Sequence, residues 1–355
     1  MKTLKLLAMS LIAALAFTAC DNDDDPAVII DPVFEQEIVV LNNGNWGAND
    51  ANILRYSLTA DKTLPQAFLA ANGRQLGDLG QDIAVVGQDI YIAVNGSQVV
   101  FVTDRNFQVQ HEIVATEGET KLSPRYFCVV DKKVYVTYYE GYLGEINTKD
   151  YTVRTTPVGN SPEGVAYADG TLYVANSGGA NYPNYDNTLS VVDAKTFKET
   201  DRIEVNLNPQ NVIASPDGKT LFVNSFGNYA DIPAKLQSIS TTSHAVSDLD
   251  YTDVKSICQG SGDNLYVVTG GYDENWNVAG QIHLHDMKTN TPRGLFVDNL
   301  FSNYYSISFS NGYVCVGLSD YKTNGDVLVY DDKANFVTRF DAQGLNPQKV
   351  LVFGK

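Results

Sequence analysis

The chain has 355 residues and a formal net charge of −17, with 42 acidic against 25 basic side chains. This charge excludes nucleic acid as a partner, because binding to a phosphate backbone depends on releasing counterions to a basic patch. Four cysteines are too few for a disulfide-stapled scaffold of this length. Cys128, Cys258 and Cys315 lie in strand-like apolar runs, so we expect buried free thiols at these positions.

The first residues predict a signal peptide over residues 1–19. Lys2 and Lys5 precede an apolar run, Leu6–Ala19, that is shorter than the roughly 20 residues of a membrane-spanning helix. The sequence Phe-Thr-Ala-Cys at residues 17–20 resembles the bacterial lipobox, which implies that Cys20 is acylated and anchors the chain in a membrane. An ordinary signal peptide followed by an incidental cysteine is the alternative.

Residues 20–35 predict a solvated tether. The run Asp21–Pro26 holds four aspartates and is too polar to fold alone. An acidic run at this place resembles the surface-export signal of Bacteroidetes lipoproteins, which implies a lipid-anchored protein on the outer face of the outer membrane. The simpler reading is a linker without a sorting role.

Residues 36–355 predict a single domain built from repeats. The pattern combines an opening x-P-x-x-V, an apolar strand, an Asp-Gly turn and a second apolar strand, and it is clearest at 161–193 and 208–225. The successive openings are aligned at Asp82, Arg125, Glu163, Gln210, Val254, Tyr305 and Gln348, with a mean spacing of about 44 residues. A period of this length, with β-branched and aromatic strands, is typical of β-propeller blades.

The two ends of this domain predict how the propeller closes. Glu37–Asn43 matches the second strand of a blade without a first strand before it, and Asn346–Phe353 matches a first strand without a blade after it. Pairing these segments protects two sheet edges. We therefore expect an all-β, seven-bladed propeller in which N- and C-terminal strands share one blade. The segments 170–176 and 189–196 resemble YVTN or YncE-type propellers, which supports this fold.

The loops predict a ligand-binding face. In a propeller, the loops between second and third strands and those between blades meet around one mouth of the central channel. Here they contain both tryptophans, many tyrosines and many asparagines, a composition typical of ligand surfaces. The plainer interpretation is that Asn and Gly form turns. The candidate ligand-binding residues are Asn43, Trp46, Asn95, Tyr126, Tyr138, Tyr139, Asn176, Tyr185, Asn211, Asn224, Phe226, Tyr229, Tyr272, Trp276, Tyr305 and Tyr321.

An enzyme is the less favoured alternative. The four histidines, at 111, 244, 283 and 285, fall outside these loops, and the pair His283 and His285 has no third metal ligand nearby in the sequence. Glu140, Asp273, Glu274 and Asp320 leave open a carboxylate-dependent hydrolase or a calcium-assisted lyase. We expect a binding protein with no catalytic residues, no metal site and no cofactor of its own.

A closer resemblance suggests the ligand. The lipobox, the acidic tether, the segment Val40–Gly47 and the single seven-bladed body resemble the BtuG-type surface cobalamin-binding lipoproteins of Bacteroidetes. This resemblance implies binding of cobalamin (vitamin B12) or a related corrinoid and its delivery to a TonB-dependent transporter of the BtuB type. Capture of a glycan or another nutrient, with Trp46 or Trp276 as a stacking platform, is the alternative.

Overall fold

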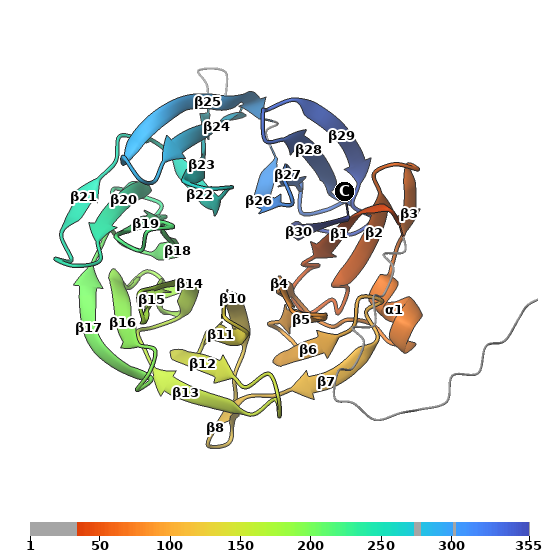
Figure 1. Cartoon of the computed structure of the whole chain (residues 1–355), viewed down its shortest axis with the longest axis horizontal. Helices are drawn as coiled ribbons and strands as arrows, with labels where there is room; N and C mark the ends of the chain where they lie inside the picture. Colours follow the sequence, from red (N-terminus) through yellow and green to blue (C-terminus); the bar gives the residue numbers. More distant parts are fainter. Residues whose placement is uncertain (1–33, 273–277, 301–302, 355) are drawn as a thin grey trace, which may run out of the picture. The chain divides into compact units, whose positions relative to one another are not determined.

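The computed structural model describes residues 34–272, 278–300 and 303–354. In this part of the chain, the strands form seven four-stranded antiparallel sheets arranged in a ring, and one two-stranded hairpin (Figure 1). The all-β prediction and the predicted number of blades are confirmed.

Each blade contributes four strands, and the first strand of each lies at the central axis. Blade one contains β30 (Pro347–Gly354), β1 (Gln36–Asn42), β2 (Asn52–Ser57) and β3 (Lys62–Leu64); blade two contains β4 (Gly80–Val86), β5 (Asp89–Val94), β6 (Val99–Thr103) and β7 (Val109–Ile113). Blade three contains β10 (Pro124–Val130), β11 (Lys133–Tyr138), β12 (Tyr142–Ile146) and β13 (Val153–Pro157); blade four contains β14 (Pro162–Ala168), β15 (Thr171–Asn176), β16 (Thr188–Asp193) and β17 (Lys198–Glu204). Blade five contains β18 (Pro209–Ala214), β19 (Thr220–Ser225), β20 (Lys235–Ser240) and β21 (Val246–Asp248). Blade six contains β22 (Val254–Gln259), β23 (Asn264–Tyr272), β24 (Val278–Asp286) and β25 (Thr291–Leu300); blade seven contains β26 (Tyr304–Ser310), β27 (Tyr313–Leu318), β28 (Asp326–Asp331) and β29 (Phe336–Asp341).

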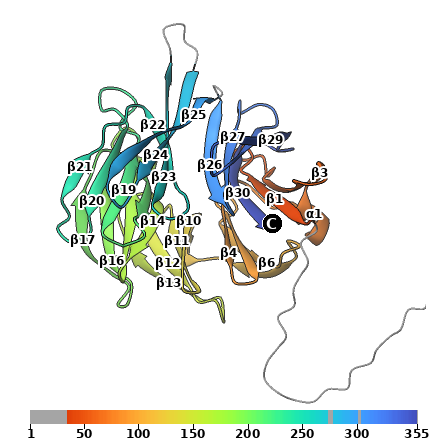
Figure 2. The ribbon, with the colours of Figure 1, turned by 45° about the horizontal axis from the view of Figure 1, so that its top comes forward.

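Three small elements lie in the connections. The helix α1 (Ala67–Asn72) joins blades one and two, the hairpin β8 (Thr116–Glu117) and β9 (Thr120–Lys121) follows blade two, and the 3₁₀ turn η1 (Gly179–Asn181) lies between β15 and β16. Within the described residues, no helix has the length and apolar character needed to cross a membrane. The long strands of blade six, β23–β25, extend beyond those of the neighbouring blades (Figure 2).

The core is divided among the seven interfaces between neighbouring blades. On β15, Leu172 and Val174 pack toward blade three, whereas Tyr173 and Ala175 pack toward blade five. Burial on both faces explains why the second strands are nearly continuous apolar runs rather than alternating ones. Comparable clusters fill the other five interfaces.

Closure of the ring is as predicted. The strand β30 pairs antiparallel with β1 from Gln36 opposite Gly354 to Asn42 opposite Pro347. The first and last strands of the body therefore share one sheet, as Figure 1 shows. This pairing removes the two open edges that the chain ends would otherwise present.

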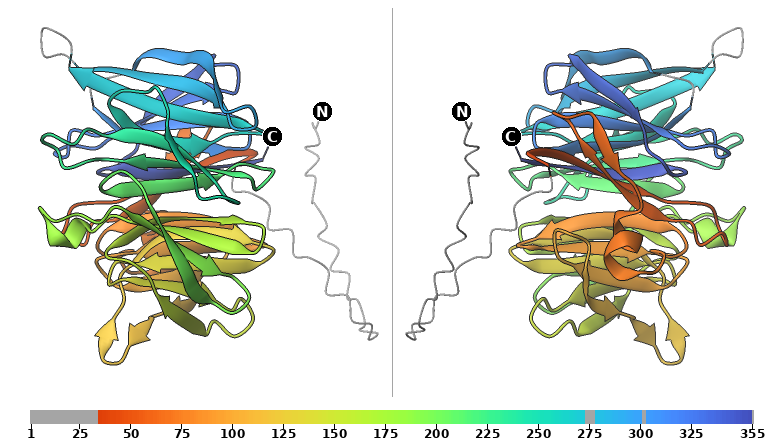
Figure 3. Two further views of the ribbon diagram at one scale, coloured as in Figure 1. Left: turned by 90° about the vertical axis from the view of Figure 1, so that its left-hand side faces the viewer. Right: turned by 90° about the vertical axis from the view of Figure 1, so that its right-hand side faces the viewer.

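The two faces of the ring differ in the connections they carry. One face, called here the loop face, holds the loops from second to third strands and the connections between blades; η1 lies on it, and β30 ends on the opposite face (Figure 3). A repeated bond holds the loop face together. In each blade a backbone N–H at the end of the second strand donates to the carbonyl of the residue that precedes the inner strand, at 2.8–3.2 Å. The predicted convergence of these loops on one face is confirmed.

Candidate functional site

A β-bulge stands at the same place in every inner strand. On β10, Pro124 is opposite Tyr138 and Phe127 is opposite Val136, so that Arg125 and Tyr126 together face Thr137. The same extra residue occurs in the other six inner strands. Bulges re-aim side chains and are frequent at functional sites. We call the seven residues at this position the bulge ring: Gln81, Arg125, Glu163, Gln210, Lys255, Tyr305 and Gln348.

The backbone immediately before the bulge is also distinctive. In five blades the residue preceding the inner strand has a positive φ, between 44° and 62°: Leu79, Ser161, Asn208, Asp253 and Asn346. Asn and Asp enter this conformation more readily than other non-glycine residues. The sequence alignment is wrong by one residue in two blades, because Asp82 and Val254 are not the equivalents of Arg125. Gln81 and Lys255 take that place, since the bulge and not the apolar pattern sets the register there.

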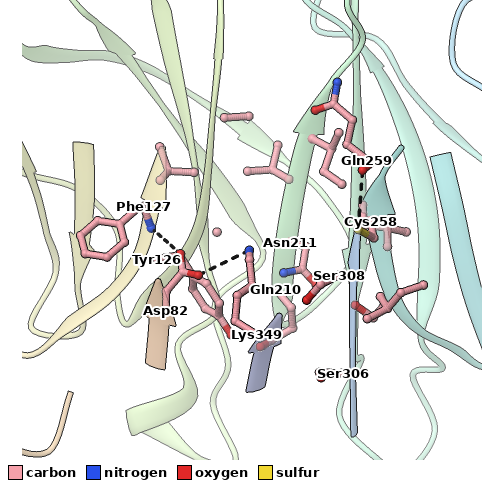
Figure 4. A pocket seen from close by; sticks show the side chains of 18 of the residues that line it. Asp82, Tyr126, Phe127, Gln210, Asn211, Cys258, Gln259, Ser306, Ser308 and Lys349 are labelled. Carbon is pink, nitrogen blue, oxygen red and sulfur yellow. Dashed lines mark hydrogen bonds and ion pairs between the residues drawn. The ribbon is translucent and has the colours of Figure 1, made fainter. Parts of the chain in front are cut away.

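The bulge ring surrounds the mouth of a central cavity of about 950 Å³. Its members other than Glu163 line this cavity, and so do the residues that follow them, including Asp82, Asn211 and Lys349 (Figure 4). Farther along the inner strands the wall is mixed, with polar side chains such as Ser308 and Gln259 beside apolar ones such as Val130. The cavity thus has a polar mouth at the loop face above a wall of mixed character, and a concave site with placed polar groups is a usual place for a small-molecule ligand.

An ion pair at the mouth connects three blades. Arg125 donates from Nε and Nη2 to Oε2 of Glu163, at 2.9 and 2.6 Å, and from Nη1 to Oε1 of Gln81 at 2.7 Å. The Glu163 side chain is only 5% exposed. Burial raises the pKa of the Glu163 carboxyl, and the guanidinium of Arg125 opposes that rise. The Arg125 guanidinium also lies 5.3 Å from the ring centre of Tyr139 and 5.7 Å from that of Tyr126.

A second ion pair connects blades one, two and three. The Lys349 ammonium lies 3.4 Å from Oδ1 of Asp82, whose other oxygen accepts a hydrogen bond from the backbone N–H of Phe127 at 2.9 Å (Figure 4). Asp82 raises the pKa of the Lys349 ammonium. Lys255 differs from these groups, because no carboxylate of the described residues lies within ion-pair distance of it. The charges at the mouth are therefore mostly fixed in pairs, with one exposed lysine.

Four of the eleven predicted aromatic residues line the cavity at this mouth. Tyr126, Phe226, Tyr305 and Tyr321 line the cavity, as do Asn43 and Asn211. The rings of Tyr305 and Tyr321 lie 5.7 Å apart, edge to face. Burial raises the pKa of the Tyr126 and Tyr305 hydroxyls, which stay protonated and able to donate hydrogen bonds.

Other predicted residues lie around the mouth without lining it. Tyr139 stacks on Arg125, and Tyr185 and Tyr229 continue the aromatic surface outward over blades four and five. Trp46 is 80% exposed, in the loop between β1 and β2. Trp276 and the side chain of Tyr272 lie outside the described residues, as does Cys20.

Four predicted ligand residues are structural instead. Tyr138 is 1% exposed within the core between blades two and three, and Asn224 is fully buried. Asn176 donates to the hydroxyls of Thr188 and Ser190, and Asn95 donates to the carbonyl of Pro124. These positions end the second strand or directly follow it, where side chains enter the space between blades and not the channel. Their assignment to the ligand surface is therefore wrong.

Sequence reasoning missed the charged and amide members of the bulge ring as site residues. Arg125, Glu163, Gln210 and Gln348 served only as landmarks of the repeat. The available signal was a polar residue directly after the proline that opens four of the inner strands. A strand buried against its neighbours has no reason to begin with a polar residue unless that residue faces a channel.

The carboxylates of the enzyme alternative hold turns. Glu140 accepts hydrogen bonds from the backbone N–H and the hydroxyl of Ser123, and Asp320 accepts them from the backbone N–H groups of Lys322 and Thr323. Asp273 and Glu274 lie outside the described residues. The described part of the chain contains no group of three or more His, Cys, Asp and Glu placed to hold a metal ion.

The three cysteines of the described residues are unpaired, as predicted, but among them only Cys315 is fully buried. Cys128 and Cys258 line the central cavity. Burial raises the pKa of the Cys128 thiol to about 12 and that of the Cys258 thiol to about 11. Both are therefore protonated and weakly nucleophilic near neutral pH.

Comparison with known proteins supports the fold alone. No protein-family model matches the chain, and no curated protein matches it. Among solved structures, a chain of Kuenenia stuttgartiensis hydrazine synthase is similar with a TM-score of 0.60 and 18% identity, over 75% of this chain and 86% of that one. A chain of the mitotic checkpoint complex gives a TM-score of 0.59 with 11% identity, over 96% and 92% of the two chains. The Neurospora crassa Pan2 WD40 domain gives 0.52 with 10% identity, over 81% of each chain. At these identities the likeness shows a shared propeller architecture, and function has to be argued from the site.

Proposed function

We propose that the protein binds cobalamin or related corrinoids at the cell surface and delivers them to a TonB-dependent outer-membrane transporter. The observation that carries this proposal is the cavity of about 950 Å³ with its ring of amide, phenol and charged groups. A corrinoid is a broad, flat macrocycle with amide side chains around its edge. Gln210, Asn211, Tyr305 and Gln348 offer amide and phenol partners from several blades to such an edge.

The electrostatics of the mouth agree with this ligand. The pairs Arg125–Glu163 and Asp82–Lys349 keep four charges in place without leaving a large field of one sign. Such a mouth offers polar contacts to a large ligand of low net charge. Lys255 is available to the phosphate that links the nucleotide to the corrin ring.

The construction of the mouth favours tight binding. Its residues stand on inner strands whose bulges repeat in every blade, and the loop connections are tied by the recurring backbone bond. A site fixed before the ligand arrives loses little conformational freedom on binding. We therefore propose that the protein acts by capture and not by catalysis.

The topology also suits a surface protein. The strand β1 begins at Gln36, opposite Gly354, and thus at the face opposite the loop face. If Cys20 carries the lipid anchor, the chain enters the propeller on the side away from the cavity mouth. The mouth is then free to receive a ligand and to meet a transporter.

Removal of the acylated cysteine is expected to abolish capture by cells. Cells expressing the protein should retain labelled cyanocobalamin at their surface, and the Cys20→Ser variant should be released and retain only background label. Surface label should also disappear after brief protease treatment of intact cells. Retention of label by the Cys20→Ser variant would contradict the anchor.

Glycan capture is the second candidate, and one observation favours it. Trp46 is 80% exposed on a loop of the loop face, where a sugar ring could stack on it. A panel of soluble glycans tested beside cyanocobalamin separates the two candidates. Saturable binding of a glycan with no corrinoid binding would replace the proposal.

A further inference from the structure

We propose a second subsite next to the cavity mouth, in which exposed tyrosines stack the nucleotide base of the corrinoid. This inference rests on the proposed function and assigns a contact surface to one part of the ligand, the nucleotide base. Four rings, called here the aromatic arc, form the subsite: Phe226, Tyr229, Tyr185 and Tyr182.

The aromatic arc is continuous and begins at the cavity. Phe226 lines the cavity, and its ring centre lies 6.3 Å from that of Tyr229. From Tyr229 the next ring centre, that of Tyr185, is 6.1 Å away, and Tyr182 follows at 6.0 Å. The four rings therefore form a connected row that begins at the mouth and crosses from the loop of blade five to that of blade four.

Two of the four rings are unusually exposed for large apolar groups. Tyr182 is 74% exposed and Tyr229 is 70% exposed. Contiguous exposed aromatic side chains beside a concave site indicate a binding surface. Aromatic rings stack well on flat heteroaromatic rings and lose little side-chain freedom in doing so.

The loops that carry the arc are braced. Gly178 and Gly227 adopt positive φ values of 65° and 67°, and a Cβ there would lie 2.2 Å from the nitrogen of Asp186 and 1.9 Å from the carbonyl oxygen of Ile232. Asn228 accepts hydrogen bonds from the backbone N–H groups of Ala230 and Ile232. The rings therefore stand on fixed backbone, as preorganised stacking requires.

The chemistry of the aromatic arc fits the nucleotide base of a corrinoid whose macrocycle occupies the cavity mouth. A corrinoid with a nucleotide carries a flat heteroaromatic base below one face of the corrin ring, where its own ring faces remain open to stacking. When the macrocycle occupies the polar mouth, the base needs an apolar, planar surface within reach. The arc provides this surface on one sector of the loop face, over two of the seven blades.

The test compares cyanocobalamin with dicyanocobinamide, which lacks the nucleotide. In the purified Cys20→Ser protein, Tyr182→Ala combined with Tyr229→Ala should weaken cyanocobalamin binding by about 5- to 150-fold, the range of base–aromatic stacking. Binding of dicyanocobinamide should change less than about twofold. As a single substitution, Tyr229→Ala should weaken cyanocobalamin binding, whereas Tyr229→Phe should bind cyanocobalamin as tightly as the unsubstituted protein. The reason is that stacking needs the ring and not the hydroxyl.

Phe336→Ala is the matched control, since Phe336 is 57% exposed on the outer strand β29, away from the mouth. Equal losses for the two corrinoids, or no loss for either, would overturn the aromatic subsite while leaving corrinoid binding itself intact. An unsubstituted protein that binds neither corrinoid would overturn the proposed function and the subsite together.

Discussion

Replacement of Arg125 by methionine is expected to destabilise the propeller by about 3–5 kcal/mol at neutral pH. Arg125 is the partner of Glu163, whose side chain is only 5% exposed. Methionine fills similar space but leaves the carboxylate buried without a counter-charge. Urea denaturation at constant pH measures the difference in the free energy of unfolding.

The pH dependence of this variant has a definite sign. Burial raises the pKa of Glu163, so the folded state holds the proton more firmly than the unfolded state. Protonated Glu163 therefore favours the folded state at low pH, and this contribution to stability is lost as the pH rises through the pKa of Glu163 in the folded protein. Without Arg125 the pKa of the Glu163 carboxyl rises further. The free energy of unfolding should therefore fall more steeply between about pH 5 and pH 7 in the variant than in the wild type.

The double variant Arg125→Met with Glu163→Gln is the control for this prediction. A neutral amide at position 163 removes the buried charge, so the double variant should recover much of the lost stability and its extra pH dependence should vanish. A double variant as unstable as Arg125→Met alone would show that packing, and not the unpaired carboxylate, is the cause.

Substitution of Tyr305 by alanine is expected to weaken corrinoid binding by about 30-fold or more, the effect of a binding hot spot. Tyr305 belongs to the bulge ring, lines the cavity and packs edge to face against Tyr321 at 5.7 Å. Its removal deletes a broad contact and a hydroxyl that burial keeps protonated. Calorimetric titration gives the affinity, and thermal unfolding reports whether the fold persists.

Tyr138→Phe is the control for Tyr305→Ala. The Tyr138 hydroxyl is buried in the core and has no hydrogen-bond partner among the described residues. Its loss should leave the affinity unchanged. An equal loss of affinity in both variants would indicate a general effect on the fold and would contradict the assignment of the mouth as the binding site.

The architecture was accessible from the sequence because it repeats. The spacing of the strand openings gave the number of blades, and the unmatched segments Glu37–Asn43 and Asn346–Phe353 gave the closure. The loop face followed from chain direction alone, since alternate connections in a meandering sheet must meet at the same end. These features depend on periodicity and not on the conformation of any single residue.

The site was only partly accessible, for reasons of local backbone geometry. A bulge shifts the register by one residue, and that residue decides whether a side chain enters the channel or the space between blades. In blade two the inner strand opens with Gly80 and in blade six with Val254, so the proline that marks other blades gives no register there. Asn176 ends as an interior residue because its amide can serve the core as well as a ligand, by donating to Thr188 and Ser190.

The most direct measurement is a calorimetric titration of the purified Cys20→Ser protein with cyanocobalamin, combined with co-elution of the coloured ligand on gel filtration. We expect saturable one-to-one binding, co-elution of ligand with protein, and weaker binding by Tyr305→Ala. An absence of heat and of co-elution at micromolar concentrations of both components would contradict this expectation.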